Sequence, residues 1–323
     1  MVRQVPLGAS GFMVSEFVFG AGSIGGVGAS AATRGFGLTG LEAEKRLDEA
    51  WELGITMLDT ADSYGGGQSE IIVGDWLKNR QPAGMVVGSK VGLVSNPDGT
   101  RGRDLSRARI EGQLKQSIDR LGRVDLYLTH APDPNTPVEE TVGTFSEMQD
   151  AGLIKAYGVS NVDARLLTEV LETADRHGWH RPVTIENRLN LLDRSDEEEI
   201  LPMVSSEQLG YTPFSPLAGG VLSERYLDGA VPEEGSRIAV AGHLYYQGFH
   251  TPENLERVTA LREVARDMGT SVSGLALAWL RDHPAITAPI VAPRTSAHWD
   301  AVHDADECRL DTAAHDRISQ IFA

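Results

Sequence analysis

The sequence predicts an α/β protein built on an (α/β)8 barrel, the TIM-barrel architecture. Short apolar runs alternate with longer stretches whose apolar residues recur at helical spacing, which is typical of a parallel sheet. Successive units are separated by roughly 30 residues, the length of one strand, one helix and their loops. Polar residues end three successive runs, and in barrels of this kind the carboxyl ends of the strands carry the functional side chains.

The first half of the chain begins with a predicted hairpin over residues 2–14, because turn residues from Gly8 to Gly11 separate two short apolar segments. Strand 16–22 precedes a helix over 41–53, and strand 55–61 precedes a helix over 69–78. Strand 85–91 is followed by a polar loop and a helix over 106–121. After strand 125–130, a helix opens at Pro137, where a proline followed by two acids favours a first turn.

The second half continues the alternation with strand 156–161, helix 164–175, strand 183–190, helix 196–209 and strand 210–216. Residues 217–252 are rich in glycine and proline and predict a long loop with broken helical pieces. Helices over 253–268 and 272–282 then lead to an eighth strand at 288–293. We therefore expect one barrel domain over residues 1–323, with long loops over the carboxyl ends of its strands. Residues 20–28, 95–103 and 222–249 are the expected mobile loops around the site.

Composition and charge restrict the classes of function. The chain has 323 residues and a formal net charge of −17, which argues against nucleic acid or an anionic membrane as a partner. A local basic pocket for a phosphate remains compatible with this charge. Cys308 is the single cysteine, so no intrachain disulfide forms, which fits a reducing compartment. The N-terminus lacks an apolar leader, and no apolar run reaches about 18 residues. We expect a cytoplasmic protein.

Asp59, Tyr64, Lys90 and His130 lie at or just beyond the ends of predicted strands. A lysine ending a buried strand needs a counter-charge, and Asp59 on the neighbouring strand is the natural partner. An ammonium beside Tyr64 would lower the phenol pKa from ~10 toward neutrality and make this residue a general acid. His130 can donate a hydrogen bond to a carbonyl oxygen. The arrangement predicts an enzyme.

Other interpretations of these residues remain open. In the simplest interpretation, Lys90 and Asp59 form a structural ion pair. In another, a neutral Lys90 forms a Schiff base in a lyase, although the neighbouring Asp59 argues against a neutral amine. The glycines at 20–28 (GAGSIGGVG) follow a strand, but the next helix starts only near residue 40, which disfavours a Rossmann fingerprint. No metal-ligand cluster stands out.

The sequence also resembles the aldo-keto reductase family over nearly its whole length. The shared segments are 58–70 (LDTADSYGGGQSE), 88–90 (GSK), 120–130 (RLGRVDLYLTH), 158–161 (GVSN), 190–194 (NLLDR) and 215–220 (SPLAGG). Residues 130–141 are similar to the aflatoxin-aldehyde and succinic-semialdehyde reductase branch. The resemblance implies a barrel that binds NAD(P)H in extended form without a Rossmann domain.

By this resemblance the protein reduces an aldehyde or ketone, such as a keto-sugar or an intermediate of secondary metabolism. Tyr64 would protonate the carbonyl oxygen, Lys90 held by Asp59 would tune Tyr64, and His130 would position the substrate. Ser160, Asn161 and Glu186 would meet the nicotinamide amide, and Phe214 would stack on its ring. The other residues expected to contact the cofactor are Gly22, Ser23, Asp59, Ser215, Pro216, Leu217 and Gly219.

The chain departs from the family pattern at three places. Glu186 stands where a glutamine is usual, and a carboxylate can accept a hydrogen bond from the nicotinamide amide but cannot donate one. The loop after strand eight lacks the usual glycine, although Arg294, Thr295 and His298 could bind a 2′-phosphate, which favours NADPH over NADH. Ala301 and Val302 replace the polar pair that holds adenine.

Two further expectations follow. The aromatic residues Tyr226, Tyr245, Tyr246 and Phe249 are expected to line the substrate pocket. The altered adenine loop also leaves open a binding module that keeps the cofactor and has little turnover, as potassium-channel β-subunit relatives suggest.

Overall fold

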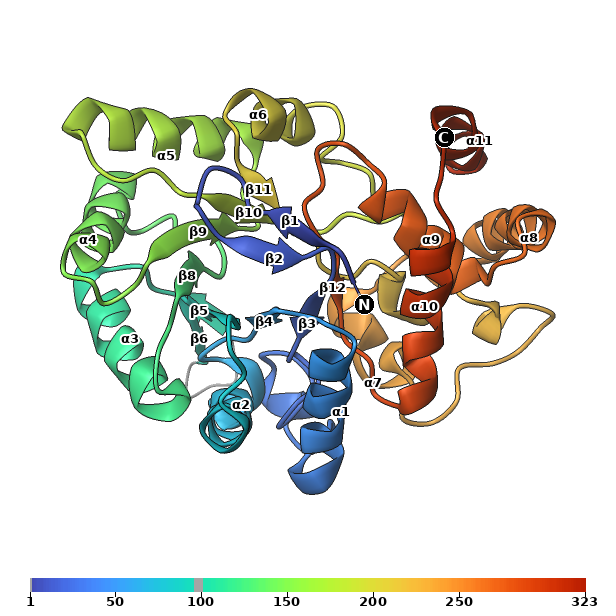
Figure 1. The fold of residues 1–323 in the computed structure, drawn as a ribbon, viewed down its shortest axis with the longest axis horizontal. Helices are drawn as coiled ribbons and strands as arrows, with labels where there is room; N and C mark the ends of the chain where they lie inside the picture. Colours follow the sequence, from blue (N-terminus) through green and yellow to red (C-terminus); the bar gives the residue numbers. More distant parts are fainter. Residues whose placement is uncertain (1, 96–100) are drawn as a thin grey trace.

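Eight parallel strands from separate parts of the chain form a barrel at the centre of the molecule (Figure 1). The computed structural model describes residues 2–95 and 101–323. The last strand pairs with the first, and the backbone N–H of Ile290 donates to the carbonyl oxygen of Pro213 at 2.9 Å, which closes the sheet. In order around the barrel the strands are β3 (Val18–Gly20), β4 (Met57–Asp59), β5 (Val86–Val91), β8 (Leu126–Thr129), β9 (Ala156–Ser160), β10 (Thr184–Glu186), β11 (Gly210–Tyr211) and β12 (Ile290–Val291).

Helices surround the barrel and alternate with its strands (Figure 1). Helix α5 shows why, because its buried residues Leu167, Val170, Leu171 and Ala174 form one apolar face at helical spacing. The helices are α1 (Gly40–Glu52), α2 (Gln68–Arg80), α3 (Arg107–Leu121), α4 (Val138–Asp150), α5 (Ala164–His177), α6 (Ile200–Ser206), α7 (Arg237–Tyr245), α8 (Pro252–Asp267), α9 (Val272–Arg281), α10 (Asp300–Glu307) and α11 (Thr312–Ile321). Short 3-10 turns are η1 (Ala31–Thr33), η2 (Tyr64–Gly66), η3 (Ala218–Gly220), η4 (Glu224–Tyr226) and η5 (Ser296–Trp299).

The predicted barrel is confirmed, with all eight strands at the expected places and mostly shorter than expected. The strand predicted over 183–190 ends at Glu186, and beyond it the pairing continues only as an isolated parallel bridge between Arg188 and Phe214. The Asn187 side chain pairs with the backbone N–H and carbonyl of Val162. The helix predicted over 196–209 begins only at Ile200, since residues 195–199 form turns. Residues 217–252 contain broken helical pieces as expected, namely η3, η4 and α7.

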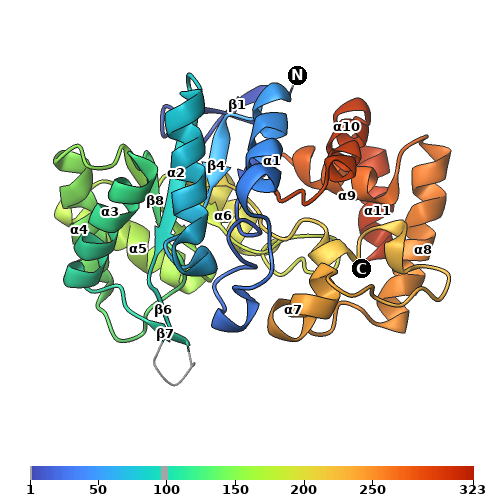
Figure 2. The ribbon, with the colours of Figure 1, turned by 90° about the horizontal axis from the view of Figure 1, so that it is seen from below.

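The predicted N-terminal hairpin consists of β1 (Gln4–Pro6) and β2 (Met13–Ser15), paired antiparallel. It lies across one end of the barrel (Figures 1 and 2). Leu7 and Val14 are fully buried there and pack in one cluster with Met57 and Ile290 from the first and last parts of the barrel. The hairpin therefore closes the end of the barrel at which the strands begin.

The opposite end carries a second hairpin and the long loops (Figure 2). Strands β6 (Leu93–Ser95) and β7 (Arg101–Arg103) pair antiparallel there, although the sequence predicted only a polar loop after β5. The expected loop over 95–103 lies partly outside the described residues. Helix α7 projects on the same side (Figure 2).

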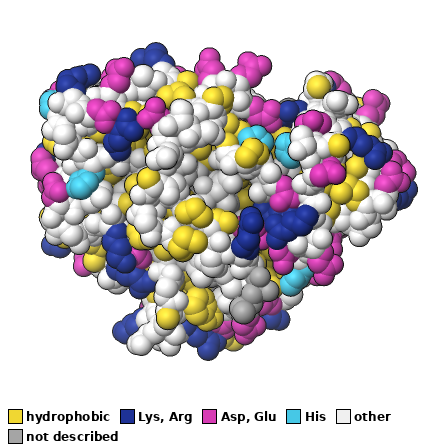
Figure 3. Space-filling model, turned by 45° about the horizontal axis from the view of Figure 1, so that its top comes forward, with side chains coloured by type: hydrophobic (Ala, Val, Ile, Leu, Met, Phe, Trp, Pro, Cys, Tyr) yellow, Lys and Arg dark blue, Asp and Glu magenta, His cyan; other side chains and the backbone are white. Residues whose placement is uncertain are grey.

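Helices α10 and α11 follow the eighth strand and were not predicted. Each has a short apolar face, with Val302 and Ala305 buried in α10 and Ile318 buried in α11. Across the described ranges, no helix is both long enough and apolar enough to cross a bilayer. Acidic and basic side chains are interspersed on the face shown in Figure 3.

Candidate active site

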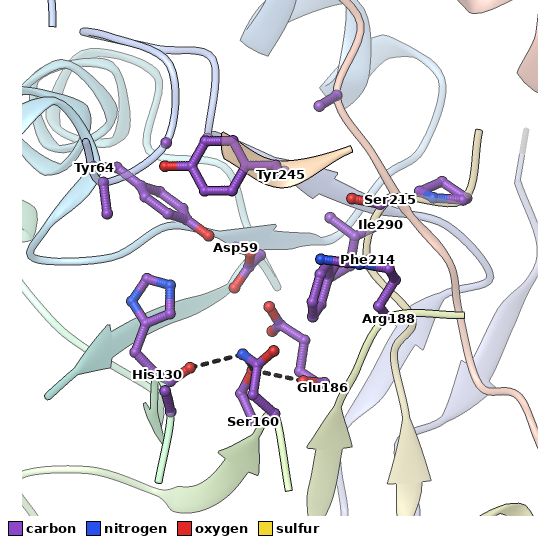
Figure 4. Close-up of a pocket in the computed structure, with 18 of the residues that line it drawn as sticks. Asp59, Tyr64, His130, Ser160, Glu186, Arg188, Phe214, Ser215, Tyr245 and Ile290 are labelled. Carbon is purple, nitrogen blue, oxygen red and sulfur yellow. Dashed lines mark hydrogen bonds between the residues drawn. The ribbon is translucent and has the colours of Figure 1, made fainter. Parts of the chain in front are cut away.

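A cavity of about 1740 Å³ opens at the carboxyl ends of the barrel strands. Its walls come from the loops after most of the strands, from η3 and from helix α7. Asp59, Tyr64, His130 and Glu186 all line it, although they lie far apart in the sequence. Figure 4 shows these side chains converging on one part of the cavity, with Phe214 on the side opposite His130.

Lys90 lies behind the cavity wall near the end of β5 and is 1% exposed. Its ammonium pairs with Asp59 at the end of β4, as expected from the sequence. It also pairs with Oε1 of Glu186 at the end of β10, at 3.0 Å, and donates to the backbone carbonyl of Thr60 at 3.2 Å. The sequence analysis missed that Glu186 shares this lysine. Two carboxylates and one ammonium therefore form a buried cluster.

Tyr64 follows β4 in the turn η2, with Lys90 Nζ 5.2 Å from its ring centre. Burial raises the pKa of Tyr64 above its ordinary value, and the carboxylates of Asp59 and Glu186 raise it further, against the lowering by the Lys90 ammonium. The expected lowering of this pKa toward neutrality is therefore wrong. The phenol keeps its proton over the physiological range and has it available to donate.

The cluster beneath Tyr64 is strongly coupled. Burial lowers the pKa of Lys90, but Asp59 and Glu186 raise it by more, so the ammonium stays charged. Burial raises the pKa of Asp59 against the opposing effect of Lys90. Burial, reinforced by the Asp59 charge, raises the pKa of Glu186 to about 8. The three groups therefore do not all carry their charges at neutral pH.

His130 follows β8 and its ring meets the Tyr64 ring edge-on, with 5.4 Å between the ring centres. Nδ1 lies 3.3 Å from the hydroxyl oxygen of Ser63. The backbone is held on both sides, because His130 N–H donates to Val91 and its carbonyl accepts from the amide of Asn161 at 2.9 Å. These bonds hold the backbone of His130, and the edge-on contact places its ring beside the Tyr64 ring.

Ser160 and Asn161 lie where β9 ends, beside Glu186. The hydroxyl of Ser160 donates to the backbone carbonyl of Glu186 at 2.6 Å, and the Asn161 side chain donates to the Ser160 hydroxyl at 3.0 Å. Asn161 has φ of 58°, a left-handed conformation that is uncommon outside glycine and frequent at ligand sites. The structure brings both residues together with Glu186 on one wall of the cavity.

Phe214 is contacted by an arginine. The guanidinium of Arg188 lies 5.8 Å from the Phe214 ring centre and 5.7 Å from that of Phe249, within cation–π distance of both rings. The next residue, Ser215, has φ of 55° and turns the chain into η3. The other expected contact residues here, Pro216, Leu217 and Gly219, also line the cavity.

Most of the residues expected at the two far parts of the cofactor site line the cavity. Gly22 and Ser23 line the cavity, as do Arg294 and His298, whereas Thr295 is exposed and lies outside the lining. Arg294 donates to the carbonyl oxygen of Gly235 at 2.9 Å, and its backbone N–H donates to Nδ1 of His298. Four of the five residues thus face the cavity.

The sequence analysis missed a group of arginines in the long loop. Arg225 and Arg237 line the cavity near Arg294, and burial together with their charges lowers the pKa of Arg294. Within the described residues, none of the three forms an ion pair with a carboxylate, although the net charge of the chain is −17. The sequence signal that could have revealed them is the presence of arginines in a Gly- and Pro-rich loop of an acidic chain.

The expected aromatic lining is correct in part. Tyr245 and Tyr246 line the cavity, whereas Tyr226 is fully buried and neither it nor Phe249 contributes to the lining. Tyr246 lies 3.2 Å from the hydroxyl oxygen of Ser215, and Arg237 lies 6.0 Å from its ring centre. Burial raises the pKa of Tyr246, but Arg237 and the Ser215 contact outweigh burial and lower it.

The parallel eight-stranded barrel brings a buried lysine, a tyrosine and a histidine together at the ends of its strands. This arrangement is typical of barrel oxidoreductases. The aldo/keto reductase family matches residues 18–323, and the chain belongs to this family. The resemblance noted in the sequence is therefore confirmed. Members of this family are oxidoreductases that use nicotinamide cofactors.

Relatives carry two kinds of name. A probable voltage-gated potassium channel subunit beta from Oryza sativa subsp. japonica is 32% identical, over 88% of this chain and 85% of the relative. The aldo-keto reductase YhdN from Bacillus subtilis is 30% identical, over 84% and 81%. The solved glycerol dehydrogenase AKR11B4 from Gluconobacter oxydans has a TM-score of 0.82 at 24% identity, over 99% of this chain and 95% of that one, which shows the fold alone.

Proposed function

We propose that this protein reduces an aldehyde or ketone to an alcohol, using NADPH as the reductant. The observation that carries the proposal is the buried Lys90 ammonium, which lies 5.2 Å from the ring centre of Tyr64 in the cavity wall. Because its pKa is raised, the phenol stays protonated until a carbonyl oxygen begins to take up negative charge. Tyr64 then donates its proton as general acid.

The surrounding residues would orient the carbonyl group. His130 has its ring fixed next to Tyr64, where it can direct the carbonyl oxygen toward the hydroxyl. Lys90 would stabilise the phenolate that remains after proton donation, since the charged ammonium lies 5.2 Å from the Tyr64 ring centre. Asp59 keeps Lys90 charged. When bound, the cofactor supplies the hydride.

The cavity residues fit an extended dinucleotide. Its volume of about 1740 Å³ exceeds that of an ordinary small-ligand pocket, which is roughly 300–1,000 Å³. Phe214, backed by Arg188, offers a flat face for a nicotinamide ring, with Ser160, Asn161 and Glu186 beside it for the amide. The residues that would follow the phosphates are Gly22, Ser23, Ser215, Pro216, Leu217 and Gly219.

The arginines favour NADPH over NADH. Arg225, Arg237 and Arg294 face the same part of the cavity with no carboxylate partner among the described residues, and crowded cations of this kind are stabilised by an anion. Arg294 and His298 would bind the 2′-phosphate. Thr295, which points away from the cavity, is left out of this proposed site.

The substitution Tyr64→Phe tests the proposal. It removes only the acidic proton, so we expect turnover of carbonyl substrates to fall by about 10²–10⁴-fold while NADPH affinity stays nearly unchanged. Turnover would be measured by NADPH absorbance over a panel of aldehydes and ketones, and affinity by fluorescence titration. Tyr245→Phe is the matched control, because Tyr245 lines the same cavity and should lose less than about tenfold. Full activity in Tyr64→Phe would exclude Tyr64 as the acid.

A second candidate is a cofactor-binding subunit with little turnover, favoured by the relatives named as potassium channel subunits beta. Tight NADPH binding without measurable oxidation by any carbonyl in the panel would support it. A Schiff-base lyase is disfavoured, because two carboxylates keep Lys90 as an ammonium. Borohydride trapping that added mass to Lys90 would reverse that judgement.

A further inference from the structure

Ser63, the residue before Tyr64, contacts the His130 ring from outside the cavity. Its hydroxyl oxygen lies 3.3 Å from Nδ1 of His130. His130 lines the cavity and Ser63 does not, so the contact is made within the wall of the protein. Figure 4 shows the two nitrogens of the His130 ring facing different directions, one of them toward the side on which the Tyr64 hydroxyl lies. Nδ1 is therefore engaged by the protein, which leaves Nε2 to face the cavity.

The backbone holds both partners of this contact. The N–H of Asp62, which precedes Ser63, donates to the carbonyl oxygen of Lys90 at 3.1 Å. The N–H of His130 donates to the carbonyl oxygen of Val91, the next residue of β5, at 2.7 Å. Because consecutive residues of one strand anchor the two segments, the distance between the Ser63 hydroxyl and the His130 ring is set by the barrel itself.

The direction of this hydrogen bond determines what Nε2 can do. A neutral imidazole carries a proton on one nitrogen only, and the bond made by one nitrogen decides the state of the other. If Nδ1 carried the proton and donated to Ser63, Nε2 would present a lone pair to a carbonyl oxygen and repel it. If the Ser63 hydroxyl donates to Nδ1, Nε2 carries the proton and can donate. Across residues 2–95 and 101–323 the Ser63 hydroxyl has no other hydrogen-bond partner, so its proton is free for His130.

We propose that Ser63 is a positioning residue for carbonyl reduction: its hydroxyl donates to Nδ1 of His130 and fixes the imidazole as the Nε2–H tautomer, which donates to the carbonyl oxygen of the substrate. This role rests on the proposed function. Ser63 transfers no proton and does not touch the substrate; it acts through His130. The net strength of one neutral hydrogen bond corresponds to about a two- to tenfold preference for this tautomer.

Nitrogen NMR of the full-length protein, with ¹⁵N-labelled histidine and without cofactor, tests the tautomer directly. Protonated and bare ring nitrogens resonate in separate ranges, and loss of one set of signals in His130→Gln identifies His130 among the nine histidines. At about pH 8.5, where an ordinary imidazole is neutral, the wild type should carry its proton mainly on Nε2. In Ser63→Ala the ratio of the Nε2–H to the Nδ1–H form should fall by about two- to tenfold, and Ser63→Thr, which keeps the hydroxyl, should restore it.

Steady-state kinetics with the carbonyl panel test the consequence for the reaction. In Ser63→Ala, kcat should fall by up to about tenfold, while the NADPH dissociation constant stays unchanged because Ser63 lies outside the cavity lining. Ser63→Thr should recover kcat. Ser205→Ala is the matched control, since the Ser205 hydroxyl in α6 donates to the carbonyl oxygen of Leu201 at 3.2 Å and also lies outside the lining. It should change neither the spectrum of His130 nor kcat.

The outcomes separate this proposal from the proposed function. A wild-type His130 protonated on Nδ1, or the same tautomer ratio in Ser63→Ala and wild type, would overturn the role of Ser63. An altered ratio with unchanged kcat would show that the tautomer does not matter for the reaction, which also overturns it. If the spectra change as expected but the wild type reduces no carbonyl, the proposed function fails while the effect of Ser63 on His130 is upheld.

Discussion

Lys90 shows how one residue joins stability to chemistry. An ammonium that is 1% exposed survives because its three donors meet Asp59, Glu186 and the carbonyl of Thr60. The same contacts keep it charged beneath Tyr64. Removing the Lys90 cation would leave two buried carboxyl groups without a counter-charge. This destabilises the fold more than replacing all the charged partners by apolar residues would.

We therefore expect Lys90→Met to lower the free energy of unfolding by about 3–5 kcal/mol at neutral pH. The loss should be smaller near pH 5 than near pH 8. The pKa values of Asp59 and Glu186 are already raised in the folded protein, and without Lys90 they rise further, so folding takes up protons and stability falls as pH rises. Urea denaturation at the two pH values measures both effects.

Lys155 provides the control for this substitution. Its Nζ lies 2.8 Å from Asp125, but its side chain is 67% exposed. Lys155→Met should change stability by only about 0–1 kcal/mol, because the Lys155 ammonium is exposed to water and the buried Asp125 keeps Arg123 as a partner at 3.0 Å. An equal loss in the two variants would contradict the importance of burial at Lys90.

At the scale of elements, helices α2 and α3 approach each other through a glycine. A Cβ built on Gly74 in α2 would lie 1.9 Å from the carbonyl oxygen of Arg120 in α3. The backbone of α3 cannot yield locally without moving the helix. The close approach also lets Arg120 reach Glu70 at 2.6 Å, and Glu70 in turn accepts from Ser89 beside Lys90.

Gly74→Ala should accordingly destabilise the protein by about 1–3 kcal/mol or more through overpacking. Gly112→Ala in α3 is the matched comparison, because a Cβ there meets nothing within 4 Å. That change should stabilise by about 0.5–1 kcal/mol through helix propensity. Thermal unfolding of the two variants measures both effects. An unchanged stability of Gly74→Ala would show that α2 and α3 can move apart at little cost in free energy.

The strands also show how much of the fold could be predicted from the sequence. Strand positions were predictable because their apolar runs and terminal polar residues are local. Strand ends were not, since they depend on pairing with neighbouring strands, as in the isolated bridge between Arg188 and Phe214 beyond Glu186. The four residues at the site were predictable from their places at strand ends. The third member of the lysine cluster was not, because the contact of Glu186 with Lys90 joins β10 to β5 across the barrel.

At the scale of the whole molecule, charge is distributed unevenly between surface and cavity. The chain carries a net charge of −17, yet Arg225, Arg237 and Arg294 gather on one part of the cavity wall. An anionic nucleotide is therefore attracted locally and repelled at long range. The places of Arg225 and Arg237 could not be predicted, because they depend on how the long loop of residues 217–252 folds back.

We expect Arg294→Gln to weaken NADPH binding by about tenfold while leaving NADH binding nearly unchanged, because a single charge-assisted contact to the 2′-phosphate is lost. Raising the ionic strength should weaken NADPH binding to the wild type more than to this variant. Arg165→Gln serves as a control, since Arg165 lines the same cavity but lies 3.8 Å from Glu169 and is largely exposed. Equal losses for both nucleotides in Arg294→Gln would place the 2′-phosphate elsewhere.

The closure of the barrel has a consequence for how the protein is made. Strand β3 leaves the ribosome early, but its second neighbour β12 begins at Ile290. At about 5–20 residues per second, β3 waits roughly a quarter of a minute to one minute for that partner. Until then one edge of β3 and one edge of β11 stay open to pairing with other chains. We therefore expect the yield of folded protein to depend more on translation speed and chaperone access than on the stability of the folded state.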